Sequence, residues 1–282
     1  MHIGKKINEE INFVDTVQTL VKAYEEISVV NMQRARSTVL TAREFLDLLH
    51  EVFSDVKMSY ANEIAKIENK KKQSKKNGKK RAGIFLSANS RLYGDIIKRI
   101  FNLYLKDYGN TYDEMIIIGK VGKELLEASH KNINFRFIDY DDKDISKELI
   151  LSIMNEVKEF DSVQVYYGKF ENVVTQEPVM MEILGDLVVS DTKIQKVNFY
   201  FEPALAQVLA YFESQVISAF LLQSIHESDL AKLASRTKTM EQARQRIEDK
   251  QKALILLSHR AKRIMDDKKQ QERLSGMFLW KK

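Results

Sequence analysis

One short segment of this sequence suggests phosphate chemistry. Gly119-Lys120-Val121-Gly122-Lys123 follows a β-rich run, a place where backbone N–H groups of a glycine-rich turn can hold phosphate oxygens. A phosphate-binding loop needs GxxxxGK followed by Ser or Thr, and both the spacing and the hydroxyl fail here, because Glu124 follows Lys123. The sequence also contains no GxGxxG motif. We therefore interpret 119–123 as a strand-to-helix turn and expect no nucleotide site.

Metal and nucleophile chemistry find equally little support. The five histidines show no pair at ligand spacing: His2, His50, His130, His226 and His259. Four aspartates lie close together at 139, 141, 142 and 144 and could attract a cation, although we interpret them as a solvated turn. The chain has no cysteine, which excludes disulfides, thiol catalysis and thiolate metal sites. No nucleophile–base arrangement is evident. We predict a non-catalytic chain without cofactor or metal.

Two long helical stretches at the ends of the chain are expected to position any surface that binds a partner. Residues 1–66 and 204–282 contain no proline and only Gly4 and Gly276, whereas both prolines and the other eight glycines lie between 78 and 203. Apolar residues recur there in steps of three and four, which is helical periodicity. In the last stretch these steps define a coiled-coil seam at Met240, Ala243, Ile247, Lys250, Leu254, Leu257, Ala261 and Ile264. We expect antiparallel packing, with apolar residues of 10–55 facing Met240, Ile247, Leu254 and Leu257.

The middle of the chain has a different pattern. Short β-rich runs occur at 84–86, 115–118, 135–138, 163–167 and 197–200, with helical patterns at 95–107, 120–129 and 144–157. This alternation favours an α/β sheet with crossover helices, to which 173–184 adds an antiparallel strand. The predicted fold class is α/β: a Rossmann-like domain plus a long antiparallel coiled coil formed by the terminal helices. The predicted divisions are a helix at 1–68, a basic linker at 69–81, the α/β domain at 82–202 and a helix at 203–282.

The net charge of +5 comes from one segment. Residues 69–81 carry eight positive charges and no acid, so the rest of the chain stands at −3. Nucleic-acid binding is one reading, but the segment lacks aromatic residues for base stacking. We favour a solvated connector. No apolar core of a signal peptide follows Met1, and no stretch approaches the roughly 18 apolar residues of a membrane span. We therefore expect a chain that acts inside the cell.

Several short motifs occur in one order along the chain. They are K-A-Y-E-E-I-S-V-V-N-M-Q-R-A at 22–35, S-A-N-S-R-L-Y-G-D at 87–95, Y-Y-G-K-F at 166–170 with Q-E-P at 176–178, F-E-P at 201–203, and A-S-R with Met240 and Ala243 from 234 onward. Over nearly its whole length the chain thereby resembles the gamma subunit, the rotor shaft of F-type ATP synthases. The last two motifs match the family's F-E-P and A-[AS]-R-x-x-A-M-x-x-A most closely.

The resemblance also implies which residues contact partners. Positions that contact the catalytic ring in the family correspond here to Lys22, Tyr24, Arg236, Met240, Arg260, Arg263, Asp267 and Glu272. The chain departs from the family near its end. Arg263, Asp267 and Lys269 stand at the family's Gln, Thr and Glu, and the last change inverts a charge. The partner loop is then expected to differ too, as in a specialised F-type-like ATPase.

The function that the resemblance implies is that of a gamma-like central rotor shaft. Such a chain is a non-catalytic subunit that couples ATP hydrolysis or synthesis to rotation. Its implied partners are a hexameric ring of alpha- and beta-like ATPase subunits and an epsilon-like or other stalk subunit, with a membrane ring left open and no nucleic acid. The implied location is cytoplasmic, peripheral to the membrane through partner subunits. The alternative is a non-rotary coiled-coil scaffold or adaptor, because residues 266–273 contain no apolar member.

Overall fold

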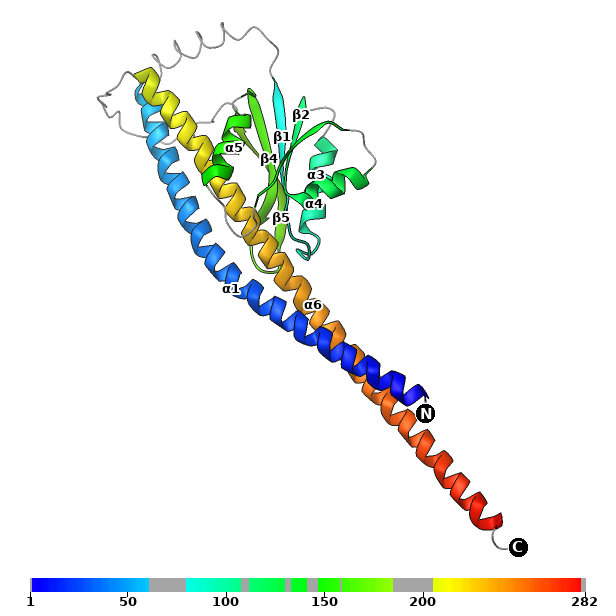
Figure 1. Cartoon of the computed structure of the whole chain (residues 1–282). Coiled ribbons are helices and arrows are strands. Elements are labelled where there is room, and N and C mark those ends of the chain that lie inside the picture. The colour runs from blue at the N-terminus through cyan, green and yellow to red at the C-terminus, as the bar shows by residue number, and fades with distance from the viewer. Residues whose placement is uncertain are drawn as a thin grey trace. The chain divides into compact units, whose positions relative to one another are not determined.

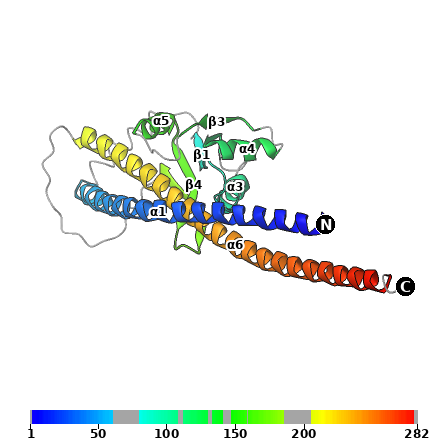
Figure 2. The same cartoon turned by 60° about the horizontal axis from the view of Figure 1, so that its bottom comes forward.

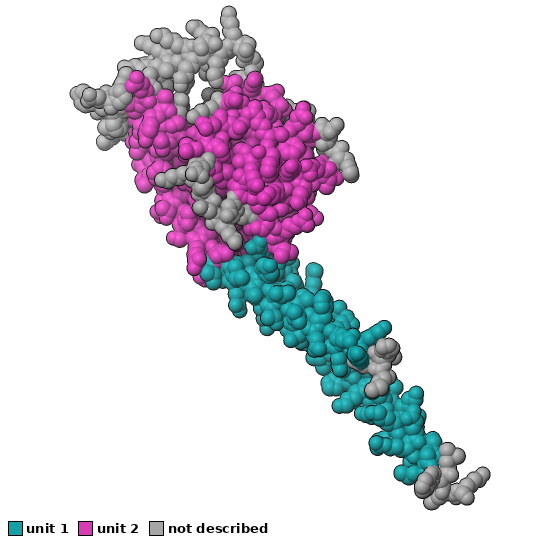
Figure 3. All heavy atoms as spheres, viewed as in Figure 1, with its two compact units in different colours: residues 1–30, 236–282 teal, residues 31–235 magenta. Residues whose placement is uncertain are grey.

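The chain forms two compact units. The computed structural model describes residues 2–60, 80–107, 112–129, 133–140, 147–157, 159–184 and 205–279. One unit comprises residues 31–235, and the other comprises residues 1–30 and 236–282 (Figure 3). The predicted strand at 197–200 and nearly all of the basic segment 69–81 lie outside the described residues. The predicted divisions at 68, 81 and 202 therefore stay predictions.

A five-stranded sheet forms the centre of the unit 31–235. Its strands are β1 (Arg81–Leu86), β2 (Glu114–Ile118), β3 (Phe135–Ile138), β4 (Ser162–Phe170) and β5 (Gln176–Leu184), in the order β3-β2-β1-β4-β5. The first four are parallel, and β5 runs antiparallel to β4. This confirms the predicted α/β class and the added antiparallel strand. Nearly every residue of β1 and β2 is buried, as expected for parallel strands covered on both faces.

Helices cover the two faces of this sheet (Figures 1 and 2). One apolar core joins it to α3 (Ile96–Asp107) and α4 (Lys120–Ala128), through Ile96, Ile100 and Leu126. The other core joins it to α5 (Lys147–Val157) and the long C-terminal helix α6 (Leu205–Leu279), through Ile153 and Leu221. The helices predicted at 95–107, 120–129 and 144–157 are thus confirmed as crossover helices, although residues 144–146 lie outside the described part of the chain.

The long N-terminal helix α1 (His2–Ser59) pairs with α6 in both units. Within the unit 31–235, Phe53 and Val56 of α1 pack with Leu209 and Val216 of α6 in a small apolar core. Within the other unit, ion pairs join Glu10 to Lys250 and Glu25 to Arg244, so the numbers rise on one helix as they fall on the other. The predicted antiparallel pairing is confirmed there.

One expectation about apolar stretches is corrected. Among the described residues, α6 contains an 18-residue window of mean hydropathy 1.3, which by length and composition alone suffices to cross a membrane. Core helices of water-soluble proteins pass the same test. In this chain Leu221 and Ile225 of α6 lie in the sheet core, and Leu209 and Val216 lie against α1. Internal packing therefore accounts for part of the apolar character of this helix, since 41% of the window is buried.

Candidate functional site

The residues expected to contact partners gather in the unit formed by 1–30 and 236–282. Lys22 and Tyr24 lie on α1, and the other six lie on α6. Lys22, Arg260, Arg263, Asp267 and Glu272 are exposed, as is Tyr24, whose exposed fraction is 46%. Arg236 is half-buried. Met240 is only 7% exposed, which leaves little of its side chain for a partner; it instead supports the interface between the helices.

That interface has a narrow apolar seam. Val14 of α1 and Met240 and Leu254 of α6 are buried, and Ile247 is half-buried, so this part of the predicted seam is correct. Leu257 is 48% exposed and Ile264 is 69% exposed, so their predicted packing is wrong. Ile264 is exposed because α1 is too short to reach it, whereas Leu257 is exposed because it lies on the face beside the half-buried positions 251, 258 and 261. Because Glu10 pairs with Lys250, the first turn of α1 lies opposite about residue 258 of α6.

Beyond that point α6 continues without α1 beside it. Its described side chains from 262 to 277 are all exposed. Exposed apolar residues recur over the whole unit, at Phe13, Leu20, Tyr24, Ile27, Leu256, Ile264, Leu274 and Met277. These exposed apolar side chains are available for contact with a partner protein.

A charged cluster adjoins Lys22 and Tyr24. The Arg244 guanidinium donates to both carboxylate oxygens of Glu241 at 2.7 and 2.9 Å and to Glu248 at 2.7 Å, and lies 3.6 Å from Glu25. Burial, followed by the hydrogen bond to Glu241, raises the pKa of Glu25. The hydrogen bond from Arg244 lowers the pKa of Glu241. Arg244 and Glu25 line an open groove together with Lys22, Glu26, Val29 and Val30.

The glycine-rich segment 119–123 serves the packing of the sheet. Gly119 has φ +103°, and a Cβ there would lie 2.8 Å from the backbone of Ala88. At Gly122 a Cβ would lie 2.8 to 2.9 Å from Ser87, Ile117 and Phe85. Both glycines are thus required for α4 to start at Lys120 and lie against the strands. The predicted strand-to-helix turn is confirmed.

The first backbone N–H groups of α4 already have acceptors. Lys120 donates its N–H to Oδ1 of Asn89 at 2.7 Å, and Val121 donates to the carbonyl of Ala88 at 2.9 Å. The same Asn89 donates to Asp139, which also pairs with the Lys120 ammonium at 3.2 Å. The Asn89 hydrogen bond, ahead of the lysine, lowers the pKa of Asp139. An anion at this helix terminus would have to displace these bonds.

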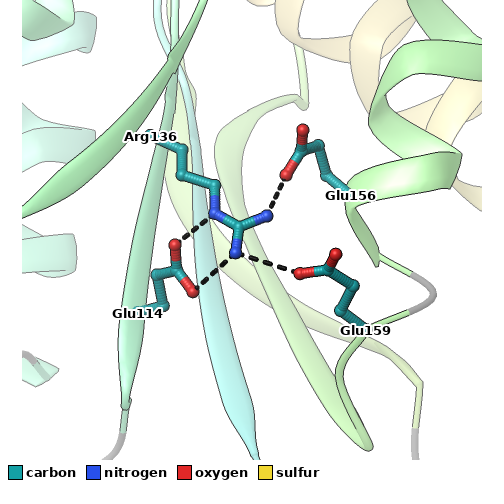
Figure 4. Close-up of polar contacts among 4 residues, drawn as sticks. All are labelled: Glu114, Arg136, Glu156 and Glu159. Carbon is teal, nitrogen blue, oxygen red and sulfur yellow. Dashed lines mark hydrogen bonds and ion pairs between the residues drawn. The ribbon is translucent and has the colours of Figure 1, made fainter.

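A cluster of one arginine and three glutamates lies at the edge strand β3 (Figure 4). Arg136 of β3 pairs with Glu114 of β2, with Glu156 of α5 and, at 3.0 Å, with Glu159. Hydrogen bonds to the three carboxylates, Glu156 first, raise the pKa of Arg136. The side chain also lies over the ring of Phe160, 5.7 Å from its centroid. These contacts hold β2, β3 and α5 together. Among the described residues, no group of three or more His, Asp or Glu is placed to hold a metal ion.

Sequence reasoning missed the ionic contacts that hold α6 in the unit 31–235. Glu227 pairs with Arg43 of α1, and Lys232 binds Asp229, Tyr140 and the Ser87 carbonyl. The one available signal was a lysine within the apolar run Leu-Ala-Lys-Leu-Ala at 230–234. That signal does not identify the other partners, because, apart from Asp229, they lie about 90 to 185 residues away along the chain.

Known proteins match the chain over almost its full length. An ATP synthase gamma chain of Ruthia magnifica is 24% identical over 98% of this chain and 99% of its own. One from Mycoplasma mycoides is 26% identical over 85% of each. In the OSCP/F1/c-ring structure of the Euglena gracilis mitochondrial ATP synthase, one chain has a TM-score of 0.70 at 13% identity, covering 97% of this chain and 93% of that one.

The rotor structure of the same Euglena enzyme gives a TM-score of 0.66 at 11% identity, over 93% of this chain and 98% of the other. These structural likenesses show the fold. The family model described as ATP synthase matches residues 4–264, which include the sheet, all of α1 after its first two residues and most of α6. The chain therefore belongs to the ATP synthase family.

Proposed function

We propose that this chain is the gamma-like central rotor shaft of an F-type or F-type-like rotary ATPase. It couples ATP hydrolysis or synthesis in a catalytic ring to rotation. The observation that carries the proposal is the family match over 4–264, together with relatives named ATP synthase gamma chain that align with this chain end to end. Its partners are a hexameric ring of alpha- and beta-like subunits and an epsilon-like or other stalk subunit. A membrane ring completes the ion-coupled form of such a complex.

The exposed surface of the unit 1–30 and 236–282 suits this role. A single copy of an asymmetric helix pair presents a different face to each member of a ring around it. The nucleotide affinity of each catalytic site then depends on the angle of the shaft, and this coupling free energy acts in both directions. The exposed apolar side chains, among them Phe13, Leu20 and Ile264, supply contact area. Exposed Arg260, Arg263, Asp267 and Glu272 supply directional contacts to ring loops.

The chain is proposed to be the non-catalytic subunit, located in the cytoplasm and held at the membrane by its partners. The segment 119–123, which resembles a phosphate loop, supports this. Its glycines are needed for close packing, and the first N–H groups of α4 donate to Asn89 and Ala88. The same reasoning leads us to expect no tight ATP binding by the chain alone. Micromolar ATP binding, measured by calorimetry, would contradict this part of the proposal.

The experiment that tests the function is purification of the tagged chain with its partners. We expect ATPase subunits of two related types in a threefold excess over the tagged chain, and ATP-driven rotation of a bead attached to it. A scaffold or adaptor role predicts other partners or no rotation. That alternative retains one supporting observation, the exposed and wholly polar surface at 266–273.

A further inference from the structure

The carboxyl edge of the parallel strands is where open α/β sheets usually bind their ligands, at the point where strand order reverses. The strand order is β3-β2-β1-β4-β5, so the chain adds β2 and β3 on one side of β1 and then β4 and β5 on the other. The reversal therefore lies between β1 and β4. Here α6 supplies charged side chains to that edge. Lys232 reaches Ser87, the residue after β1, and Tyr140, two residues after β3.

Lys232 is completely enclosed at this edge. Its side chain is 3% exposed, and its ammonium has three partners: the carbonyl of Ser87 at 3.0 Å, the hydroxyl of Tyr140 at 2.9 Å and Asp229 at 2.6 Å. These use all three of its hydrogens. Burial alone would lower the pKa of Lys232, but Asp229 and Tyr140 raise it above its ordinary value, so the group stays charged.

The space around Lys232 is filled. The cavity that it lines with Ser87, Tyr140 and Ser228 has a volume of about 10 Å³, room for roughly one water molecule. No small-molecule ligand fits there. Apolar residues of similar volume often stabilise a protein as much as a buried ion pair does. A buried charge at this place therefore suggests a role other than stability.

A second charged contact lies five residues earlier on α6. Glu227, with a side chain only 2% exposed, pairs with Arg43 of α1, and Arg43 also reaches the carbonyl of Phe170 at the end of β4. Polar contacts therefore connect residues 227–232 of α6 to α1, to the residue after β1 and to the loop after β3, and through Arg43 to the end of β4. Directional bonds of this kind fix the rotation and the axial position of a helix on a sheet more narrowly than apolar contacts, which allow small sliding.

We propose that Lys232 is a positioning residue through which torque passes between α6 and the sheet, with its ammonium occupying the place where related α/β sheets bind a ligand. This inference rests on the proposed rotary function. Without the Lys232 bonds, α6 turns partly on its apolar contacts under load and the sheet lags behind it. The Arg43–Glu227 pair carries the remaining share.

The test uses the assembled complex with its ring fixed to a surface. Because the chain has no cysteine, a single cysteine at Val174, which is 65% exposed in the loop between β4 and β5, can carry a bead on the sheet. The variants are Lys232→Met and Lys232→Met/Asp229→Asn. The double variant also neutralises Asp229, the carboxylate that loses its contact with Lys232, and so separates stability from anchoring. Lys98→Met, at an exposed lysine of α3, is the matched control.

We expect both variants to turn a small bead at the parent's speed, within roughly twofold, and to turn a large bead roughly threefold or more slowly while ATP turnover continues. Lys98→Met should match the parent with either bead. Variants that drive the large bead at the parent's speed would overturn the inference and leave the rotary function standing. A parent complex that turns no bead would remove the proposed function, and the inference with it.

Should the variants fail to assemble, amide hydrogen exchange on the full-length chain decides instead. If the Lys232 bonds hold α6 on the sheet, their loss should make amide exchange roughly tenfold or more faster at Ser87, Tyr140 and 229–233 and leave β5 unchanged. Unchanged exchange at these residues, or equal acceleration throughout the sheet, would overturn the inference.

Discussion

The two parts of α6 contrast sharply although they belong to one unbroken helix. From 216 to 237, α6 is buried or half-buried at every described position, against the sheet and α1. From 262 to 277 every described side chain is exposed. Both parts have helical periodicity and neither has a proline. The contrast shows that burial here is decided by what lies beside the helix, and that the exposed part is available to a partner protein.

The largest expected effect tests the buried part. Leu221→Ala should lower the free energy of unfolding by about 2–5 kcal/mol, because it removes a fully buried side chain from the sheet core. Leu256→Ala, at a side chain that is 53% exposed, should change it by less than about 0.5 kcal/mol. Urea unfolding of the full chain measures both. Equal losses would show that the two parts of α6 are not differently packed.

Ion pairs should follow the same contrast. Arg43→Met leaves Glu227 buried without its partner and should cost about 2–4 kcal/mol. Adding Glu227→Gln should restore part of that loss. In the other unit, Arg244→Met faces partly exposed Glu241 and Glu248 and should cost much less, because water screens these charges. Double-mutant cycles followed by urea unfolding compare the two; a larger coupling for Arg244 would reverse the comparison.

A third change examines where the helix pair ends. Leu254→Asp removes about 1.5–3 kcal/mol of burial from the α1–α6 seam. It should expose amides of 5–30 and 240–258 to hydrogen exchange while β1 and β2 stay protected. Leu257→Asp, three residues further and 48% exposed, should leave exchange unchanged. Protection that survives Leu254→Asp would mean that the seam is misassigned.

The exposed part of α6 is tested in the assembled complex. Arg260 is exposed and corresponds to a family position that contacts the catalytic ring. We expect Arg260→Ala to lower ATP turnover or rotation rate by roughly threefold to tenfold without changing the stability of the isolated chain. Lys252→Ala, also exposed on α6, is the control. If turnover and rotation both keep the parent's values, Arg260 lies on an idle face.

The smallest effect concerns pH. Burial lowers the pKa of His226 below its ordinary value of 6.5, and nearby Asp229 opposes this only in part. As the pH falls below 6.5, the unfolded chain therefore takes up this proton before the folded chain does, and stability declines. His226→Gln should reduce the difference in urea midpoint between about pH 7.5 and about pH 5.5. An unaltered difference would assign the pH dependence to other groups.

Much of the fold could be predicted from local sequence patterns. Steps of three and four residues marked both long helices, and β-rich runs marked the strands that the structure describes, because backbone periodicity is a property of neighbouring residues. The glycine-rich turn at 119–123 was also predictable, since the phosphate-loop spacing visibly fails. The expectation for Ile264 failed because its pattern is intact while the partner helix is too short to reach it. The expectation for Leu257 failed because the half-buried positions of α6 are 251 and 258, on the neighbouring face. The candidate contact residues came from family resemblance, and their role stays a prediction.

The sequence by itself determined the element types, the α/β class and the family, since these depend on local periodicity and on ordered motifs. Only the tertiary structure decided which charges are buried. Nothing near Lys232 in the chain indicates that its ammonium meets Ser87 and Tyr140, or that Arg43 meets Glu227. Such contacts depend on how distant elements stack around one sheet, and the same lysine on an exposed turn of α6 would have been an ordinary solvated side chain.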